Sequence, residues 1–305
     1  MPSGSAGAIV SIQDYNKNFD NNSFTIAPAS GEKINGGSAS ANLALGTEGI
    51  GLTFVYVDST VGWKTVHDND FTTGGSNFVQ ATGGTETTVC TNFKVHTFTG
   101  PGSFNVLATG NPSGGNTIEY LVVGGGGAGG ADLGAGGGAG GFRHNFPSPA
   151  TGGLPVTATS YPISVGGGGT PQSTPNPSGN GRGGSGSNTV FTGSTTITSA
   201  GGGGGGGAPV AQGEHTGSPG GSGGGSGGYA PAPTAGGLGN QPPTPVSQGN
   251  NGGNGGAGGP SYPGGGGGGS AAVGTTPPAS NQPGGPGGAG TQLNIDGNNY
   301  YWAGG

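Results

Sequence analysis

Charge is scarce in this chain, and its scarcity narrows the classes of protein to which the chain can belong. Charged residues make up 6% of the 305 residues, and six of them are lysine or arginine against twelve aspartates and glutamates. A nucleic-acid-binding protein needs a basic patch to neutralise phosphates, so nucleic-acid binding is not expected. The net charge of −6 is also too small for a self-repelling, disordered chain.

Cysteine and long apolar runs are scarce as well. Cys90 is the single cysteine, so no internal disulfide can form. No apolar stretch reaches the length of a membrane helix, and residues 1–10 lack the charged and apolar regions of a secretory signal. We expect a protein that is made in a cytoplasm without a signal peptide, is not inserted into a membrane and is released by lysis. A piece of a longer chain would also fit these observations.

Glycine is what the chain has in excess. It supplies 83 residues, gathered in runs after Tyr120 that include residues 201–207 and 264–269. Such runs cannot build a helix or an ordinary sheet, because glycine loses the most backbone entropy on ordering and carries no side chain. One interpretation is a flexible linker. The varied segments between the runs, which carry tyrosine, phenylalanine, isoleucine and proline, favour ordered, extended glycine helices packed side by side.

In such a polyglycine-II bundle, each extended helix has three residues per turn and forms no hydrogen bonds within itself. Its backbone groups bond instead to neighbouring helices, since buried N–H and C=O groups must be paired. A Cβ facing a neighbour would push it away, so alanine, serine and asparagine are predicted only on faces turned to solvent. The sequence therefore predicts an all-β fold plus a polyglycine-II helix bundle, with essentially no α-helix.

The composition predicts four parts along the chain: a β module over residues 1–70, a polar linker over 71–90, a small β cap over 91–123, and glycine-rich rods joined by variable loops over 124–305. Strand-like segments in the β module lie at residues 8–14, 23–28, 52–57 and 63–66. Residues 52–57 are apolar on both faces, which suggests that another copy of the chain covers the second face. In the cap, residues 92–98 and 103–108 flank a glycine–proline–glycine turn and are predicted to form a hairpin, with 117–123 as a third strand.

If successive rods run antiparallel, the connectors are sorted between the two ends of the bundle. Counting nine rods brings the strand-like connectors at 161–165 and 188–199 back beside the cap, where they can pair with it. The same count leaves residues 292–302 at the far end, so either one rod is miscounted or the chain continues past its last residue. The connectors at 170–178 and 208–216 fall at the far end, and they are short, polar and proline-containing, as exposed tips should be.

Several stretches resemble a known family. NFKVHTFTGPGSFNV, YPISVGGGG and GNGRGGSGSNTVF, set between glycine runs, are similar to the glycine-rich tail-fibre and adhesin proteins of bacteriophages, especially phages of marine bacteria. The resemblance covers residues 92–305. Nearer the N-terminus, FTIAP and TFVYVDSTVGW resemble β modules repeated in tail fibres of phages that infect cyanobacteria. The resemblance implies a polyglycine-II bundle at a fibre tip, with the loops at one end touching a host receptor.

This resemblance implies a virion protein, extracellular after release, that binds a host surface without catalysis. Its partners would be a host-surface glycan or outer-membrane protein together with other fibre or virion proteins, and it would form a homo-oligomer, for which a trimer is common in fibres. The loop-tip residues expected to contact the receptor are Gln172, Thr174, Asn176, Gln212, Glu214, His215 and Tyr262.

No catalytic, cofactor or metal site is predicted. The histidines are far apart, no Ser/His/Asp set is present, and no helix follows a glycine run to cradle a phosphate. A calcium site at Asp68 and Asp70 is an open alternative to a plain loop. Aromatic residues of the connectors, such as Tyr161, Tyr300, Tyr301 and Trp302, either cap rod ends or stack on sugars.

Two other functions stay open on the sequence. A structural filament or matrix protein could assemble through the β modules. An ice-binding protein is less favoured, because its glycine helices follow a regular tripeptide repeat and the runs of this chain are irregular.

Overall fold

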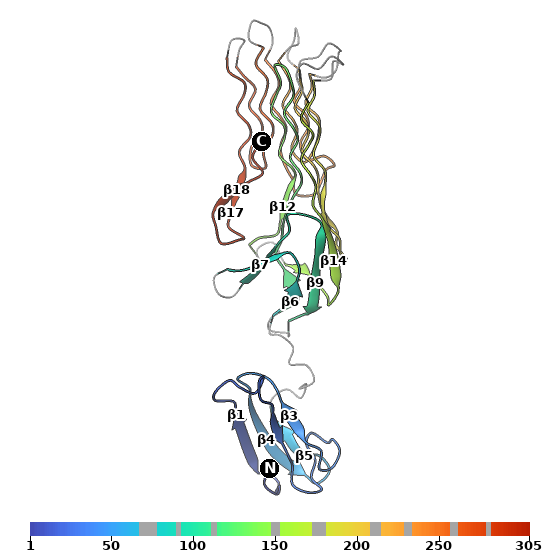
Figure 1. The fold of residues 1–305 in the computed structure, drawn as a ribbon, viewed down its shortest axis with the longest axis vertical. Helices are drawn as coiled ribbons and strands as arrows, with labels where there is room; N and C mark the ends of the chain where they lie inside the picture. Colours follow the sequence, from blue (N-terminus) through green and yellow to red (C-terminus); the bar gives the residue numbers. More distant parts are fainter. Residues whose placement is uncertain are drawn as a thin grey trace. The chain divides into compact units, whose positions relative to one another are not determined.

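The computed structural model divides the chain into two compact units, Met1–Gly75 and Ser76–Gly305, which are described separately here (Figure 1). Every helix or strand that it contains within its described residues is a β-strand, in agreement with the predicted all-β class. The structure describes residues 1–66, 78–89, 93–110, 115–147, 153–172, 181–207, 215–228, 234–256, 262–278 and 282–305.

The first unit is built on an antiparallel sheet in the order β1–β4–β5, beside the paired strands β2 and β3. Its strands are β1 (Ile9–Gln13), β2 (Phe24–Ile26), β3 (Leu43–Leu45), β4 (Gly51–Asp58) and β5 (Gly62–Thr65). Alternation along β4 turns Leu52 and Phe54 into the core, where Trp63 of β5 is fully buried. The sequence predicted each of these strands except β3.

The outer face of this sheet is apolar in part. Ile9 is 65% exposed, Val57 44% and Val66 56%. Covering of this face by another copy of the chain stays a prediction. On the inner side, the Trp63 indole N–H donates to the Glu32 carboxylate at 2.8 Å, so the polar edge of the buried ring is satisfied.

The second unit contains a five-stranded antiparallel sheet in the order β16–β15–β14–β9–β6. Its strands are β6 (Gln80–Thr82), β9 (Gly102–Ala108), β14 (Ser160–Ser164), β15 (Thr189–Phe191) and β16 (Ile197–Ser199). The connectors predicted to return beside the cap therefore do so: β14 pairs with β9, and β15 pairs with β14. The Tyr161 ring stacks on Phe191 with centroids 5.3 Å apart, and both rings lie in the core of this unit.

Short two-stranded sheets surround the five-stranded one. They pair β7 (Thr85–Val89) with β8 (Phe93–Thr97), β10 (Thr117–Ile118) with β13 (Leu154–Pro155), β11 (Leu121–Val123) with β12 (Phe142–His144), and β17 (Thr291–Leu293) with β18 (Tyr300–Trp302).

Two sequence-based expectations for the cap region are wrong. Residues 80–82 and 85–89, read as part of a polar linker, form β6 and β7, since β-branched threonines fit a strand well. The predicted hairpin of residues 92–98 and 103–108 does not form: β8 pairs with β7, because β6 and β14 occupy both edges of β9.

The predicted strand at residues 117–123 is interrupted, and Asn145 is the cause. Its side-chain Oδ1 accepts a hydrogen bond from the Tyr120 N–H at 2.6 Å, and its Nδ2 donates to the Ile118 carbonyl at 3.2 Å. Asn145 is buried, and these bonds satisfy backbone groups at the end of β10 and in the break between β10 and β11.

The glycine-rich segments lie side by side and extend away from the sheet (Figure 1). Along residues 124–131 their hydrogen bonds recur every third residue. The N–H groups of residues 124, 127 and 130 donate to the segment 135–141, and those of 125, 128 and 131 donate to the segment 181–187, at 2.7–3.0 Å. A period of three is the one expected for a helix with three residues per turn. The polyglycine-II geometry itself stays a prediction, which this bonding pattern favours.

The longest glycine run, residues 201–207, is buried along its whole length. Its N–H groups donate to the segments 124–131 and 222–228, and its carbonyls accept from the segments 134–141, 181–187 and 217–221. A Cβ at Gly203 would overlap the Ser218 carbonyl, and one at Gly204 would overlap the Gly183 carbonyl. Neighbouring segments surround this run closely, so its positions leave no room for a Cβ atom.

The count of nine rods is too low, because three of the segments that it treated as single are divided: the rod 217–228 by a reversal at 220–222, and the connectors 229–248 and 270–282 by extended segments that precede or follow reversals at 239–246 and 270–272. The first reversal is seen in the antiparallel bonds from Gly224 to Ser218 and from Gly227 to His215. With three more rods than the count of nine, residues 292–302 fall at the opposite end of the bundle from the one predicted. β17 and β18 therefore lie at the end that carries the five-stranded sheet, where Gly297 contacts Val89 of β7. Of the two explanations left open by the count of nine, the structure supports a miscount.

Small side chains do occur inside the bundle, contrary to the prediction that they face only solvent. Ala135 and Ala139 are about 5–6% exposed, and Ser222 and Ser226 are fully buried. At these positions the gap between segments is wide enough for one or two heavy atoms. The Ser226 hydroxyl also donates to the His215 carbonyl at 2.8 Å, which adds a bond that glycine could not make.

Candidate functional site

The candidate site lies at the end of the bundle that is opposite the five-stranded sheet (Figure 1). We call this end, which includes residues 131–133, the far end. Described residues that flank other connectors gather there. The Ala131 N–H donates to the Gly181 carbonyl at 2.7 Å, and the Gly228 N–H donates to the Leu133 carbonyl at 3.4 Å. Connectors that are widely separated in sequence therefore leave the bundle close together.

Three of the predicted receptor contacts lie in the described part of the chain. Gln172 is exposed, and His215 and Tyr262 are half-buried. The His215 carbonyl accepts from the Gly227 N–H at 2.7 Å, and the Tyr262 carbonyl lies against Gly228. The fold thus brings His215 and Tyr262 to the same segment.

Gln172 follows a rod that bonds to a different segment: two residues before it, the Thr170 carbonyl accepts from the Gly184 N–H. The remaining predicted contacts fall outside the described residues: Thr174, Asn176, Gln212 and Glu214. The suggested calcium ligands Asp68 and Asp70 also fall outside them.

Two residues of the far end were not singled out from the sequence. Asp132 and Leu133 have φ values of 45° and 49°, and Tyr262 has a φ of 40°. This left-handed region is uncommon for residues other than glycine and costs backbone energy, most of all for a bulky residue. Leu133 is 47% exposed, so an apolar side chain is held in solvent by a strained turn. Its sequence context, ADLG, carries no signal that would have marked it.

Arg182 is a third far-end residue that sequence reasoning passed over. Its Nη2 donates to the Thr216 hydroxyl at 2.8 Å. This bond joins the start of the segment 181–187 to the segment that begins at His215, so it fixes two connector ends relative to each other.

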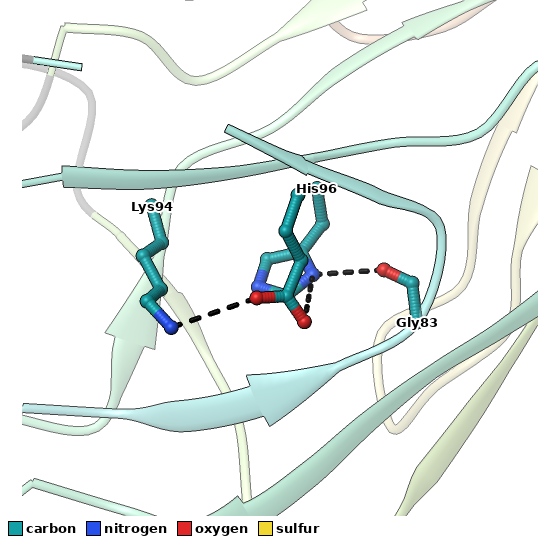
Figure 2. Close-up of polar contacts among 4 residues, drawn as sticks. Gly83, Lys94 and His96 are labelled. Carbon is teal, nitrogen blue, oxygen red and sulfur yellow. Dashed lines mark hydrogen bonds and ion pairs between the residues drawn. The ribbon is translucent and has the colours of Figure 1, made fainter. Parts of the chain in front are cut away.

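The ionisable cluster of the second unit lies at the opposite end, on β7 and β8. The Lys94 ammonium is 3.5 Å from Glu86 Oε2, and His96 Nδ1 is 3.9 Å from Glu86 Oε1. Figure 2 shows that the same His96 nitrogen also faces the Gly83 carbonyl, at 2.8 Å. His96 therefore carries its proton on Nδ1 and donates it to Gly83, which ties the turn before β7 to β8.

Asp14 of the first unit is a buried carboxylate with a structural role. Burial raises its pKa, but the backbone N–H groups of Asn18, Phe19, Gly49 and Lys17 together outweigh burial and hold the pKa below its ordinary value of 3.8. The bonds from Asn18 and Gly49 are 2.9 Å long. Asp14 thus fastens two loops and stays ionised.

Within the described ranges, no group of three histidine, cysteine, aspartate or glutamate residues is arranged to hold a metal ion. The same ranges contain no helix long and apolar enough to cross a membrane.

A family model described as a glycine-rich domain matches residues 99–305, which is more than half of the chain. The chain belongs to this glycine-rich domain family. The matched region begins just before β9 and includes β14, β15 and β16, so it covers the bundle and four strands of the five-stranded sheet, whereas β6 precedes it. Comparison with curated proteins and with solved structures gave no match.

The aromatic residues of the glycine-rich domain differ in their surroundings. Tyr161 is 5% exposed, and its hydroxyl accepts from the Thr157 N–H at 2.7 Å, so it belongs to the core. Trp302 is half-buried and donates to the Leu293 carbonyl. Tyr301 is 72% exposed, and Tyr300 is 54% exposed, which leaves both rings accessible on β18.

Proposed function

We propose that this chain is a non-enzymatic tail-fibre or adhesin protein of a bacteriophage, and that the far end of its glycine-rich domain contacts the host surface. It would reside in the virion, beside other fibre proteins, as a homo-oligomer. The partner would be a host glycan or an outer-membrane protein. The proposal is supported by the resemblance of the chain to phage adhesins and by the gathering of connector ends.

The observation that carries the proposal is the gathering of connector ends at one end of the bundle, since strained backbone and exposed apolar side chains occur at the end that carries the five-stranded sheet too, as at Ala303 and Leu107. One end is occupied by paired strands and a hydrophobic core, which stabilise it. The other end collects connector flanks, strained non-glycine residues and the exposed Leu133. Strained backbone and exposed apolar side chains both tend to be found at binding sites. Several copies on one particle would raise the avidity of a weak contact.

The test uses the full chain, labelled fluorescently and added to intact cells of a panel of marine bacteria. Three variants alter the far end: replacement of residues 170–178 by a glycine–serine segment, the same replacement of 208–216, and Leu133→Ser. Leu107→Ser is the matched control, because Leu107 is 61% exposed on β9 of the sheet. We expect the far-end variants to lose binding to any strain that the parent protein stains, and the control to retain it.

Thermal unfolding of each variant checks that the fold persists. Unchanged staining by all three far-end variants would reject the far end as the contact surface. Failure of the parent protein to stain any strain of the panel would count against an adhesin.

A structural filament is the second candidate, and one observation favours it. The β1–β4–β5 sheet exposes three apolar side chains, Ile9, Val57 and Val66, which a second copy of the chain could cover. Concentration-dependent polymers in electron micrographs, abolished by Ile9→Lys and untouched by the far-end variants, would establish this function instead.

A further inference from the structure

An open hollow of about 390 Å³ lies beside β9, between two glycine-containing turns of the second unit. One turn, Gly83 and Gly84, joins β6 to β7. The other turn, residues 99–102, joins β8 to β9. The volume falls in the lower part of the range found for small-molecule sites, roughly 300–1,000 Å³.

The walls of the hollow are held in place by contacts already described. The His96 imidazole donates to the Gly83 carbonyl, and Glu86 and Lys94 complete the cluster next to it (Figure 2). The His96 ring packs edge-on against Phe104 of the core, with centroids 5.1 Å apart. A Cβ at Gly83 would overlap the Ser103 carbonyl, so glycine is needed for the two turns to approach each other. The hollow is therefore formed before any ligand arrives.

Neutral hydrogen-bonding side chains line this hollow. Thr85 and Thr97 are directly opposite each other on β7 and β8. Ser103 and Asn105 lie on the outward face of β9, whose inward face buries Phe104 and Val106. In the described part of the chain, none of these four side chains forms a hydrogen bond to another protein group, so their hydroxyl and amide groups are available to a ligand.

One aromatic ring completes the lining. Phe98 is half-buried and packs against the hydrophobic core on one side, while it borders the hollow on the other. Its ring lies within 3.1–3.5 Å of where Cβ atoms of Gly83, Gly84 and Gly102 would stand. Only glycine leaves the ring this accessible from both turns.

We infer that this hollow binds a neutral carbohydrate. A sugar offers hydroxyls that donate and accept, which matches threonine, serine and asparagine, and an apolar C–H face that packs on an aromatic ring. An anion would find no cation among the lining residues. A wholly apolar ligand would leave the polar side chains unpaired and desolvated. Binding here would hold whether or not the far end contacts a cell.

The test measures binding of the full chain to cellobiose, maltose, lactose and N,N′-diacetylchitobiose by calorimetry or by NMR shift perturbation. Two variants remove hydrogen-bonding groups from the lining: the double variant Thr85→Val with Thr97→Val, and Asn105→Ala. Thr87→Val is the matched control, because Thr87 is exposed on the same strand but does not line the hollow. We expect at least one sugar to bind, and each lining variant to weaken it about 5- to 10-fold, the effect of one or two lost hydrogen bonds.

Three results would overturn the inference: no sugar of the panel binds, binding survives both lining variants, or sialyllactose binds while the neutral sugars do not. Replacement of residues 170–178 and 208–216 separates this site from the far end. If those replacements abolish sugar binding and the lining variants do not, the sugar binds at the far end and the hollow does not bind it.

Discussion

The first unit and the glycine bundle bury their interiors in opposite ways. In the first unit, Phe54 and Trp63 are fully buried, and side chains fill the core. In the bundle, residues 201–207 are buried along their length, yet only backbone is covered. Hydrophobic burial is non-directional and stabilises in proportion to the apolar area that is removed from water. The bundle depends on paired backbone groups at close approach, so it is sensitive to atoms being added, whereas a side-chain core is sensitive to atoms being removed.

The largest loss of stability is expected from a substitution that leaves a cavity in the core of the first unit. We expect Phe54→Ala to destabilise that unit by about 3–5 kcal/mol, because the ring is fully buried and its neighbours relax only in part. Denaturant unfolding followed by tryptophan fluorescence in a Trp302→Phe background measures the change, because Trp63 is then the one tryptophan left. Thermal unfolding of the second unit is the control, and it should not move, since the two units are separately compact.

An added methyl group in the bundle is the converse test. We expect Gly203→Ala to cost about 3 kcal/mol, because its Cβ would overlap the Ser218 carbonyl and the segments would have to separate. Gly126→Ala is the matched control. Its Cβ would lie 3.9 Å from the nearest atom, a carbonyl oxygen of Gly138, so stability should be unchanged or slightly raised.

Thermal unfolding of both glycine variants gives the comparison. Equal midpoints for Gly203→Ala and Gly126→Ala would show that the glycine segments are a loose tether and not a packed lattice.

Acid should weaken the first unit through Asp14. Its folded pKa lies below the unfolded value, so the carboxylate stabilises the fold at pH values above the unfolded pKa, and this stabilisation is lost as pH falls through the folded pKa. Denaturant midpoints measured from about pH 6 down to about pH 2 should drop more steeply in the parent protein than in Asp14→Asn. Parallel curves would mean that Asp14 is not the group responsible.

Amide exchange offers the finest test, one residue at a time. The Gly127 N–H donates to the Gly138 carbonyl at 2.9 Å, whereas the Gly126 and Gly129 N–H groups have no protein partner in the described structure. Hydrogen exchange by NMR should therefore be slow at residues 124, 125, 127 and 128 and fast at 126 and 129. Uniformly fast exchange along this segment would contradict the lattice.

Side-chain patterns made much of the fold predictable. The alternation of Leu52 and Phe54 located β4, and the strand-like connectors at 161–165 and 188–199 correctly indicated their return to the sheet. The reversal at residues 220–222 was hidden, because a glycine–serine turn has the same composition as the rods that it joins. The pairing of β8 was hidden too, since a sequence does not show that other strands already occupy both edges of β9.

The candidate site was only partly predictable for the same reason. The idea that connectors gather at one end followed from counting reversals, whereas the contact of His215 and Tyr262 with a common segment was not predicted. Leu133 and Arg182 were missed, because their roles depend on a strained turn and on a contact with Thr216, neither of which has a local sequence signature.

The sequence by itself determined that this chain has no helix-forming stretches and that long parts of it must be held by backbone rather than by side chains. That follows from composition, since glycine has nothing else with which to make contacts. Only the tertiary structure decided which glycines are indispensable, where the rods turn, and which small side chains fit inside. Those features depend on the distances between segments that are remote in the sequence. A run of identical glycines does not indicate which segments will pack against it.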